Sequence, residues 1–147
     1  MECYKKNLKS NKICVALSGG RSSAMMLRIL LDNYDSDSIL CVFANTGKET
    51  QATIDFLRTI ENQWNIKIQI VEFRSTQKYI PENGGRKKGA ISQRDCIGYA
   101  LKTLDTLSMQ GEPFLDMIEN IAAPTKSFTF CSSYLKVIPM QLFLDEH

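Results

Sequence analysis

A strand-like apolar run that ends at a serine–glycine–glycine turn constrains the fold of this chain more than any other feature of its sequence. Residues 12–17 form the apolar run, and a helical spacing of apolar side chains follows at once over residues 22–33. This order places free backbone N–H groups and the positive end of a helix dipole at the turn. Gly19 and Gly20 have no Cβ, so the backbone there can approach an anion closely. The turn predicts a phosphate-binding site, and the alternative is a plain corner between strand and helix.

The polar side chains around this turn also suit an anion. Ser18, Ser22 and Ser23 supply hydroxyl donors, and Arg21 adds a positive charge. Either Ser22 or Ser23 can in addition cap the helix that follows. These side chains strengthen the prediction of a phosphate site.

The first half of the chain alternates strands with helices. After the first helix, the pattern predicts a strand over residues 38–44, a helix over 49–63 and a strand over 67–73. Strand–helix–strand order predicts parallel pairing with right-handed crossovers, and ligands of such sheets lie beyond the carboxyl ends of the strands. We therefore expect the loops 18–23 and 45–49 to meet there, together with the segment that follows the third strand.

Two segments are expected to lie outside this pattern. Residues 1–11 are polar and basic, and we expect them to form a loose arm. Residues 74–95 include a glycine-rich basic stretch. That stretch would serve either as a lid over phosphates or nucleic acid, or as a solvated, flexible loop.

The remainder of the chain predicts three helices and a short strand. Leu101, Leu104 and Leu107 recur at helical spacing and predict a helix. The expected elements are a helix over residues 96–109, a short helix over 114–121, a strand over 127–130 and a last helix over about 133–144. Pro139 lies too far inside that last helix for its first turn. The regular helix is therefore expected to begin near Ile138, after an irregular turn.

Composition places the chain among single-domain globular proteins. Its 147 residues can bury a core without covalent staples, and 44% apolar and 23% charged residues are ordinary for that class. A net charge of +2 demands neither nucleic acid nor a membrane surface. No apolar run is long enough to span a bilayer, and no apolar signal core follows the N-terminus. We expect one domain over residues 1–147, a cytoplasmic location, and neither membrane nor nucleic acid as partner.

Cysteine and histidine usage argues against metal or imidazole chemistry. The chain has five widely spaced cysteines, at Cys3, Cys14, Cys41, Cys96 and Cys131. They contain no C-x-x-C pair, so neither a zinc site nor a dithiol is expected. Cys14 and Cys41 lie in apolar strand-like runs and are predicted to be buried, inert thiols. His147 is the one histidine, which argues against serine–histidine or cysteine–histidine catalysis.

Four ordered motifs extend over residues 13 to 140. They are S-G-G-x-x-S at 18–23, F-x-[DN]-T-G within 42–49, G-x-P-F at 111–114 with Ile118 behind it, and C-x-x-x-x-K-x-x-P at 131–139. In these motifs the chain resembles the PP-loop superfamily, specifically the phosphoadenosine phosphosulfate (PAPS) reductase family. It looks most like the short members of that family borne by phages and mobile elements. Each motif alone is modest, and the ordered set is specific.

The resemblance implies an α/β fold of the adenine nucleotide alpha hydrolase-like type. That fold has three layers, with a mainly parallel sheet of about five strands flanked by helices. The implied ligand is ATP or a PAPS-like nucleotide, with Mg²⁺ as an optional companion and without an iron–sulfur cluster. The implied binding residues are Ser18, Gly19, Gly20, Arg21, Ser22 and Ser23 for the phosphates, and Phe43, Ala44, Asn45, Thr46 and Gly47 near the adenine. Lys136 would add charge opposite the phosphates or sulfate. Lys48 and Glu49 would either touch the ligand or form a charge pair at a helix start.

The chain departs from the family at three points. PP-loop enzymes that cleave the α–β bond of ATP carry Asp where this chain has Ser22, so that carboxylate role is lost. Its replacements would be Asp95, Asp32 or Glu49, provided that the fold brings one of them near. Iron–sulfur reductases carry paired cysteines where this chain has a single cysteine followed by serine. The sequence also lacks a cysteine tail resembling E-C-G-x-H.

Without that tail, thiol attack on a sulfonucleotide would require another cysteine, Cys131 or Cys96. Cys131 is the better candidate because Lys136 lies near it, and a reactive thiolate needs a positive, exposed setting. The alternative for Cys131 is a buried residue at a strand end. The candidate catalytic residues are therefore Lys136 and Cys131, and no protein metal ligand is predicted.

Two functions remain open from the sequence. The first is a PAPS reductase-like protein that binds ATP or a sulfonucleotide and acts at its α-phosphate or sulfate. The second is a nucleotide-binding or sequestering module without turnover, such as a phage protein that binds a host protein. Self-association is a further expectation. Relatives commonly have a C-terminal extension, and apolar surface that such an extension covers would be exposed without it.

Overall fold

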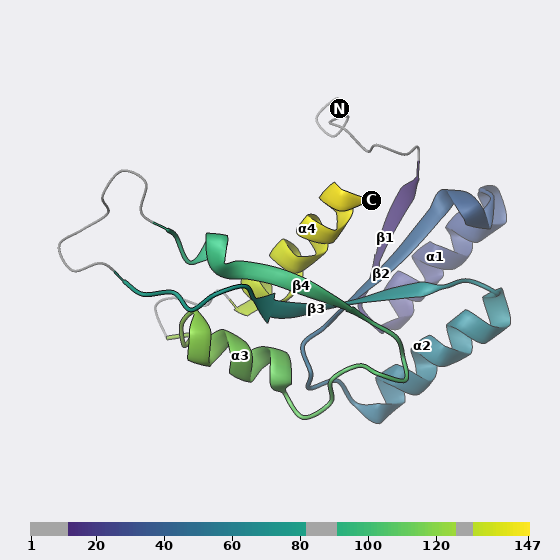
Figure 1. Cartoon of the computed structure of the whole chain (residues 1–147). Coiled ribbons are helices and arrows are strands. Elements are labelled where there is room, and N and C mark those ends of the chain that lie inside the picture. The colour runs from purple at the N-terminus through teal and green to yellow at the C-terminus, as the bar shows by residue number, and fades with distance from the viewer. Residues whose placement is uncertain (1–11, 82–90, 126–130) are drawn as a thin grey trace.

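The computed structural model of the protein describes residues 12–81, 91–125 and 131–147. Four strands form one sheet in the order β1-β2-β3-β4, and helices pack on both of its faces (Figure 1). The strands are β1 (Ile13–Leu17), β2 (Ile39–Asn45), β3 (Ile68–Ser75) and β4 (Ile97–Lys102). The helices are α1 (Arg21–Asn33), α2 (Gln51–Trp64), α3 (Glu112–Asn120) and α4 (Ile138–Glu146).

Strands β1, β2 and β3 pair in parallel, as the strand–helix alternation predicts. In the register of these pairs, Cys41 lies between Val15 on one side and Ile68 on the other. Helices α1 and α2 make the two crossovers, so the carboxyl ends of the three strands meet at one edge of the sheet. The predicted α/β fold with a mainly parallel sheet is therefore confirmed.

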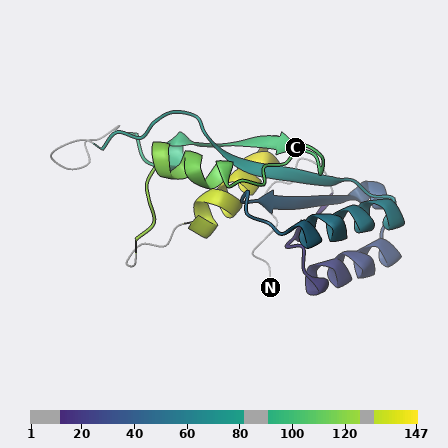
Figure 2. The same ribbon diagram turned by 90° about the horizontal axis from the view of Figure 1, so that it is seen from below.

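The two faces of the sheet are covered by different helices (Figure 2). On one face, Leu27 of α1 and Leu57 of α2 pack against Phe43 and Ile70 of the sheet, all of them buried. On the other face, Phe143 of α4 packs against Val42 and Val71. Because successive side chains of a strand point to opposite faces, the uninterrupted apolar run of β2 supplies both cores.

A further core cluster joins α3 and α4 to the carboxyl half of β3. Phe73 of β3, Met117 of α3 and Leu135 are buried together in it. Leu135 belongs to a π-helical turn over Ser133–Val137, and the regular helix α4 begins at Ile138 with a proline in its first turn. The predicted irregular turn before Ile138 is confirmed, and the physical reason is that proline has no N–H to donate inside a helix.

The predicted helix over residues 96–109 is wrong. Residues Ile97–Lys102 form β4, which pairs antiparallel with β3. The leucines that suggested one helical stripe separate in space, since Leu101 is 46% exposed on the strand whereas Leu104 is buried in the core. Pairing with the edge of β3 supplies backbone hydrogen bonds, and their stabilisation exceeds the local preference for a helix that the leucine spacing indicates.

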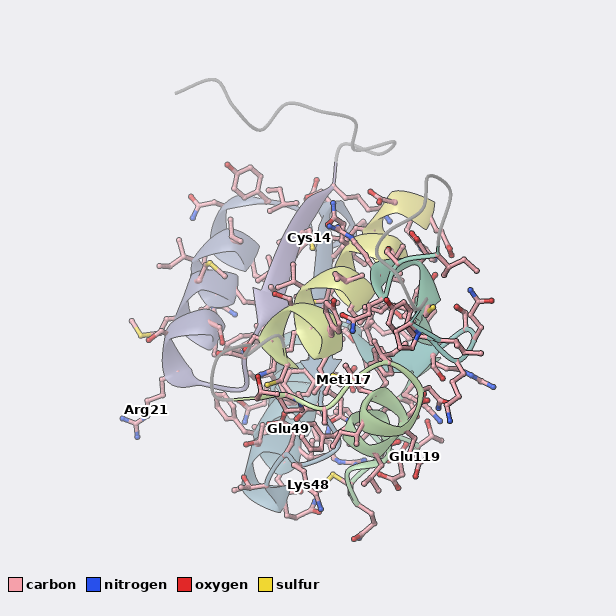
Figure 3. All side chains as sticks on the ribbon, turned by 90° about the vertical axis from the view of Figure 1, so that its left-hand side faces the viewer. Cys14, Arg21, Lys48, Glu49, Met117 and Glu119 are labelled. Carbon is pink, nitrogen blue, oxygen red and sulfur yellow. The ribbon has the colours of Figure 1, made fainter. Side chains whose placement is uncertain are left out.

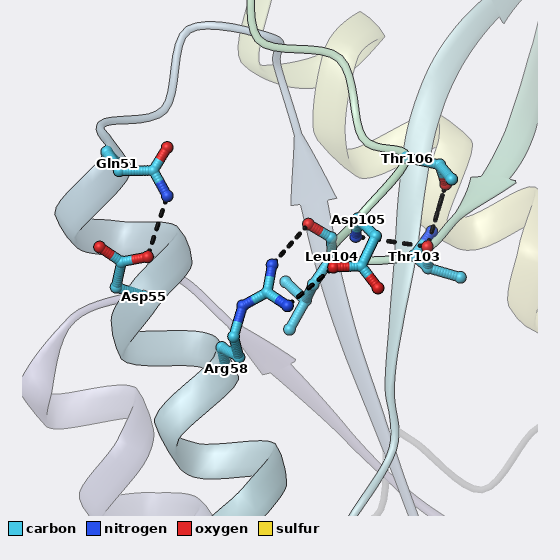
Figure 4. Close-up of polar contacts among 7 residues, drawn as sticks. All are labelled: Gln51, Asp55, Arg58, Thr103, Leu104, Asp105 and Thr106. Atoms are coloured by element: carbon cyan, nitrogen blue, oxygen red, sulfur yellow. Dashed lines mark hydrogen bonds and ion pairs between the residues drawn. The ribbon is translucent and has the colours of Figure 1, made fainter.

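A threonine turn, and not the predicted helix, follows β4 (Figure 4). The backbone N–H of Thr103 donates to Thr106 Oγ1 at 3.0 Å, and such side-chain bonds compete with helical ones. Arg58 of α2 fastens this turn by donating to Asp105 Oδ1 at 2.7 Å and to the carbonyl of Leu104 at 3.3 Å. The turn thereby lies against α2.

Several expectations fall partly or wholly outside the described residues. These are the arm at 1–11, the strand at 127–130 and part of the loop at 74–95. The described part of that loop is shorter than predicted, because β3 continues to Ser75 and a 3-10 turn covers Arg94–Cys96. The described residues contain four strands, against the expected number of about five. Within the same residues, no helix combines the length and apolar character that a bilayer crossing requires.

Candidate functional site

The turn between β1 and α1 is built around a glycine that no other residue can replace without strain. Gly19 has φ +72°, a backbone conformation that side chains disfavour. A Cβ at this position would lie 2.4 Å from Thr53 Cγ2 of α2 and 3.7 Å from the ring of Phe43. The turn is therefore pressed against the first turn of α2, with Phe43 beneath it.

Helix α1 begins without a side-chain cap. Its N-cap residue is Gly20, whose conformation is extended and which makes no capping bond, so the prediction that Ser22 or Ser23 caps the helix is wrong. Ser23 instead turns back, donating to the carbonyl of Gly20 at 3.0 Å and accepting from the backbone N–H of Ser18 at 3.2 Å. The first-turn N–H groups of a helix have no intrahelical acceptor, so this uncapped end is suited to an anion.

The loop that follows β2 interlocks with the loop that precedes α3. Gly47 has φ +82°, and a Cβ there would lie 2.7 Å from Pro113 Cδ and 3.0 Å from Gly111 Cα. Gly111 has φ +92°, and a Cβ on it would lie 2.6 Å from Lys48 Cε. These contacts explain why the G-x-P-F motif accompanies the N-T-G motif: their small residues pack against each other.

Three helix N-termini consequently gather at the carboxyl edge of the sheet (Figure 1). The turn before α1 touches Thr53 in the first turn of α2, and the loop before α2 touches Gly111, the N-cap of α3. The hydroxyl of Thr50 caps α2 by accepting from the N–H of Thr53 at 3.3 Å. Converging helix dipoles make this edge electrically favourable for a negative ligand.

A buried hydrogen-bond network lies at the same edge of the sheet, at the ends of β2 and β3. Asn45 Nδ2 donates to Glu72 Oε1 at 2.6 Å and to the carbonyl of Ser108 at 2.8 Å. Glu72, 3% exposed, also accepts from the N–H of Ser108 at 2.6 Å and from its hydroxyl at 2.9 Å. Asn45 Oδ1 accepts from the N–H of Gly47 at 3.1 Å. The network ties the ends of β2 and β3 to the segment that leads into α3.

The sequence interpretation missed Glu72, although a signal was present. In β3, Ile68 and Ile70 are buried, and Glu72 occupies the next position on the same face. A carboxylate on the inward face of a strand must find donors, because burying an unpaired charge is costly. Its position in the alternation therefore indicates a structural role at the strand end.

The predicted binding residues separate into an exposed and a buried group. Ser18, Gly20, Arg21 and Ser22 are exposed at the turn. Phe43, Ala44, Asn45 and Gly47 are buried, and Thr46 is half-buried with its hydroxyl donating to Glu49 Oε1 at 3.0 Å. The side chain of Asn45 is fully used by the network, so a ligand at this edge would meet backbone and Thr46 rather than that amide.

The predicted catalytic residues lie on the segment before α4. Lys136 is exposed in the π-helical turn, and this turn contacts both β2 and β3. Cys131 is half-buried against the apolar cluster that contains Met117 and Leu135.

Of the three carboxylates considered as replacements for the missing aspartate, Glu49 lies in the loop that leads into α2, the helix whose Thr53 touches the turn. It directly precedes Thr50, the cap of α2. Figure 3 labels Glu49 together with Lys48, the residue before it. Asp32 pairs with Arg28 near the far end of α1, and Asp95 bonds to Ser92. Over the described parts of the chain, no group of three or more His, Cys, Asp or Glu side chains is arranged to hold a metal ion.

The family model of the phosphoadenosine phosphosulfate reductase domain matches residues 12–96. An uncharacterized nin region protein of Escherichia phage lambda, ORF290, is 27% identical over 134 residues, which are 90% of this chain and 42% of that protein. A tRNA(Ile)-lysidine synthase of Bacteroides thetaiotaomicron is 34% identical over 71 residues, 48% of this chain and 17% of that enzyme. An uncharacterized protein of Methanocaldococcus jannaschii is 22% identical over 135 residues, 92% of this chain and 20% of that protein.

The chain thus covers less than half of the length of each of these relatives. No solved structure matches the chain with significance. The matched segment of the family model begins just before β1 and ends at Cys96, directly before β4. It therefore includes the turn between β1 and α1 and the loop after β2.

Proposed function

The chain belongs to the phosphoadenosine phosphosulfate reductase domain family, and from this membership we propose that it binds ATP or a sulfonucleotide and acts at the α-phosphate or the sulfate. The phosphates would lie at the turn between β1 and α1. The observation that carries this proposal is the strained glycine Gly19, followed by an uncapped helix end. An anion site uses the free N–H groups at the start of a helix as donors, whereas a plain corner between strand and helix has no use for them.

Each part of the turn has a distinct task in this proposal. The first-turn N–H groups of α1 would donate to phosphate oxygens, with the hydroxyl of Ser22 beside them. Arg21 and Lys48 are both exposed, and among the described residues neither forms an ion pair, so both charges are available to phosphate. The side-chain stem of Lys48 lies over Gly111. The adenine would pack against backbone at the end of β2 and against Thr46.

The proposed chemistry is stabilisation of charge at the phosphoryl or sulfuryl group under attack. Lys136, from the turn before α4, would balance charge that develops on the leaving group. Where Mg²⁺ accompanies the nucleotide, it would neutralise phosphate charge, and Glu49 is the carboxylate available to hold it. The attacking group is supplied by the acceptor substrate.

Two observations favour a second function, nucleotide binding without turnover. Ser22 stands exposed where related enzymes have a carboxylate, and the thiol of Cys131 is partly buried in an apolar cluster. A chain of this kind would sequester a nucleotide or present it to another protein. The phage lambda relative is itself uncharacterized, so it favours neither function over the other.

Calorimetric titration with ATP and with PAPS tests the binding step. We expect saturable binding that Arg21→Ala or Lys48→Ala weakens about tenfold, since each removes a charge-assisted contact. Lys67→Ala is the matched control, because Lys67 is an exposed cation just before β3, at the opposite edge of the sheet. Absence of binding, or equal effects of all three substitutions, would reject the proposed site.

Product analysis then separates the two functions. Incubation with ATP, Mg²⁺ and candidate acceptors, or with PAPS and a thiol donor, is followed by assays for pyrophosphate, AMP and sulfite. Release that depends on Lys136 supports catalysis. Tight binding with none of these products supports the sequestering module.

A further inference from the structure

Helix α1 carries an apolar stripe on its outer face. Met25 is 65% exposed, Met26 44% and Ile29 60%. Together with Ser22 and Leu30 they line a shallow hollow of about 430 Å³ next to the turn between β1 and α1. Contiguous exposed apolar residues on one element mark an interaction surface more often than scattered ones do.

The stripe is not needed for packing inside the protein. The inner face of α1 already supplies the core through Ala24 and Leu27, both buried. A helix on a protein surface normally carries polar residues opposite its core face. Met25, Met26 and Ile29 occupy that outer position, and methionine is well suited to adapt to a partner surface.

Opposite charges mark the two ends of this stripe. Arg21 at the start of the helix is exposed and projects away from the body of the protein (Figure 3). Asp32 lies near the end of the helix, where it pairs with Arg28, and Asp35 follows it in the sequence. Arg21 and Asp32 are eleven positions apart in the helix, a span of about 16 Å at a helical rise of about 1.5 Å. At 100° per residue, Arg21, Met25, Ile29 and Asp32 lie within one quarter of the circumference.

We infer that α1 is the interface with a second copy of this chain, packed antiparallel across a two-fold axis. Such an axis requires a self-complementary surface, in which each half matches the other when reversed. Antiparallel α1 helices place Met25 against Ile29 of the partner subunit. The same arrangement brings Arg21 beside Asp32 of the partner subunit, twice by symmetry.

Charge complementarity is what favours a second copy over an unrelated partner. A partner with only an apolar surface would leave Arg21 without a counterpart, whereas a second copy offers it the exposed carboxylates Asp32 and Asp35. In the antiparallel pair, the basic end of one helix meets the acidic end of the other, and helix dipoles also align favourably. The proposed nucleotide binding is not required for this interface.

One consequence does rest on the proposed function. Arg21 would serve both the nucleotide phosphates and the acidic end of the partner helix. A phosphate that engages Arg21 would therefore weaken the pair, and by thermodynamic linkage pairing would weaken nucleotide binding equally.

Sedimentation of the whole chain over a wide concentration range tests the interface. We expect a monomer–dimer equilibrium that Ile29→Asp weakens at least about tenfold. Leu115→Asp is the matched control, because Leu115 is 53% exposed on α3, away from the stripe. Thermal unfolding of each variant verifies that its fold is retained.

Charge reversal tests the orientation of the two helices. Arg21→Glu and Asp32→Arg should each weaken the dimer, and the double variant should restore it. A wild-type chain that remains monomeric, a dimer that Ile29→Asp leaves intact, or a double variant no better than the singles would each overturn the inference. If association behaves as expected while ATP and PAPS have no effect on it, the interface stands and the proposed function loses support.

Discussion

Asn45 Nδ2 and Glu72 Oε1 are joined at 2.6 Å inside the protein, between the ends of β2 and β3. The bond explains why an amide suits position 45, although its motif admits Asn or Asp there. A second carboxylate beside Glu72 would face both that carboxylate and the carbonyl of Ser108. The identity of the residue at the end of β2 therefore depends on the residue opposite it in β3.

Asn45→Asp is expected to lower the free energy of unfolding by about 3 kcal/mol at neutral pH, because it buries two adjacent carboxylates. The deficit should shrink as the pH falls, since protonating one carboxyl relieves the repulsion. Urea denaturation at neutral and mildly acidic pH measures both effects. Asn62→Asp, on the exposed side of α2, is the control; equal losses in the two variants would contradict the role of Glu72.

Truncation and isosteric replacement of Glu72 should differ. Glu72→Ala leaves the buried donors of Asn45 and Ser108 unpaired, with an expected loss of about 3 kcal/mol. Glu72→Gln retains an acceptor for Asn45 and a donor for the hydroxyl of Ser108, so its loss should be about 1 kcal/mol. Chemical denaturation ranks the two variants. A larger loss for glutamine than for alanine would be inconsistent with the observed hydrogen bonds.

Gly19→Ala and Gly20→Ala form a matched pair at the turn. An alanine at 19 must adopt φ +72° and displace Thr53, which should cost about 2 kcal/mol or more. An alanine at 20 keeps an extended conformation and meets nothing closer than Ser18 Oγ at 3.5 Å, so the fold should persist. Thermal unfolding of both variants gives the comparison, and equal melting temperatures would refute the strain argument.

Gly111→Ala is expected to reach the nucleotide site through Lys48. Its Cβ would lie 2.6 Å from Lys48 Cε and would displace that side chain. Nucleotide affinity should fall by about as much as in Lys48→Ala, and the double variant should be no weaker than either single one. Calorimetry on the three variants measures this. Additive losses would show that Gly111 and Lys48 act independently.

Two thiols of the sheet, buried Cys41 and half-buried Cys14, predict a loss of stability at alkaline pH. Burial raises the pKa of Cys41 to about 11 from 9.0, with a smaller contribution from neighbouring Cys14. Burial also raises the pKa of Cys14. Above pH 9 the thiols of the unfolded chain ionise while the folded ones keep their protons, so the free energy of unfolding falls as pH rises.

Urea denaturation between pH 8 and pH 10 measures this slope, which is bounded by about 1.4 kcal/mol per pH unit for each thiol. Cys41→Ala should flatten it. Tyr99 adds to the slope at higher pH, because its hydrogen bond to Glu146 raises its pKa to about 12. A wild-type chain whose stability is constant up to pH 10 would contradict the burial of these thiols.

The sequence predicted those parts of the fold that depend on local chemistry. Alternating apolar runs and amphipathic stripes predicted β1 to β3 with α1 and α2 between them. Glycine and proline predicted the turn at Gly19 and the late start of α4 near Ile138. In each case one residue restricts its own backbone, so no knowledge of distant contacts was needed.

Local patterns were enough to predict the parallel α/β core and the glycine turn after β1, because periodicity and glycine conformation act within a few residues. Long-range contacts were needed to establish that residues 97–102 pair with β3 as a strand, that Glu72 is buried among donors from two other segments, and that Met25 and Ile29 face outward. Those outcomes depend on which segments meet in space. The free energy of these long-range contacts depends on pairs of residues far apart in the chain, and a local sequence pattern does not contain that information.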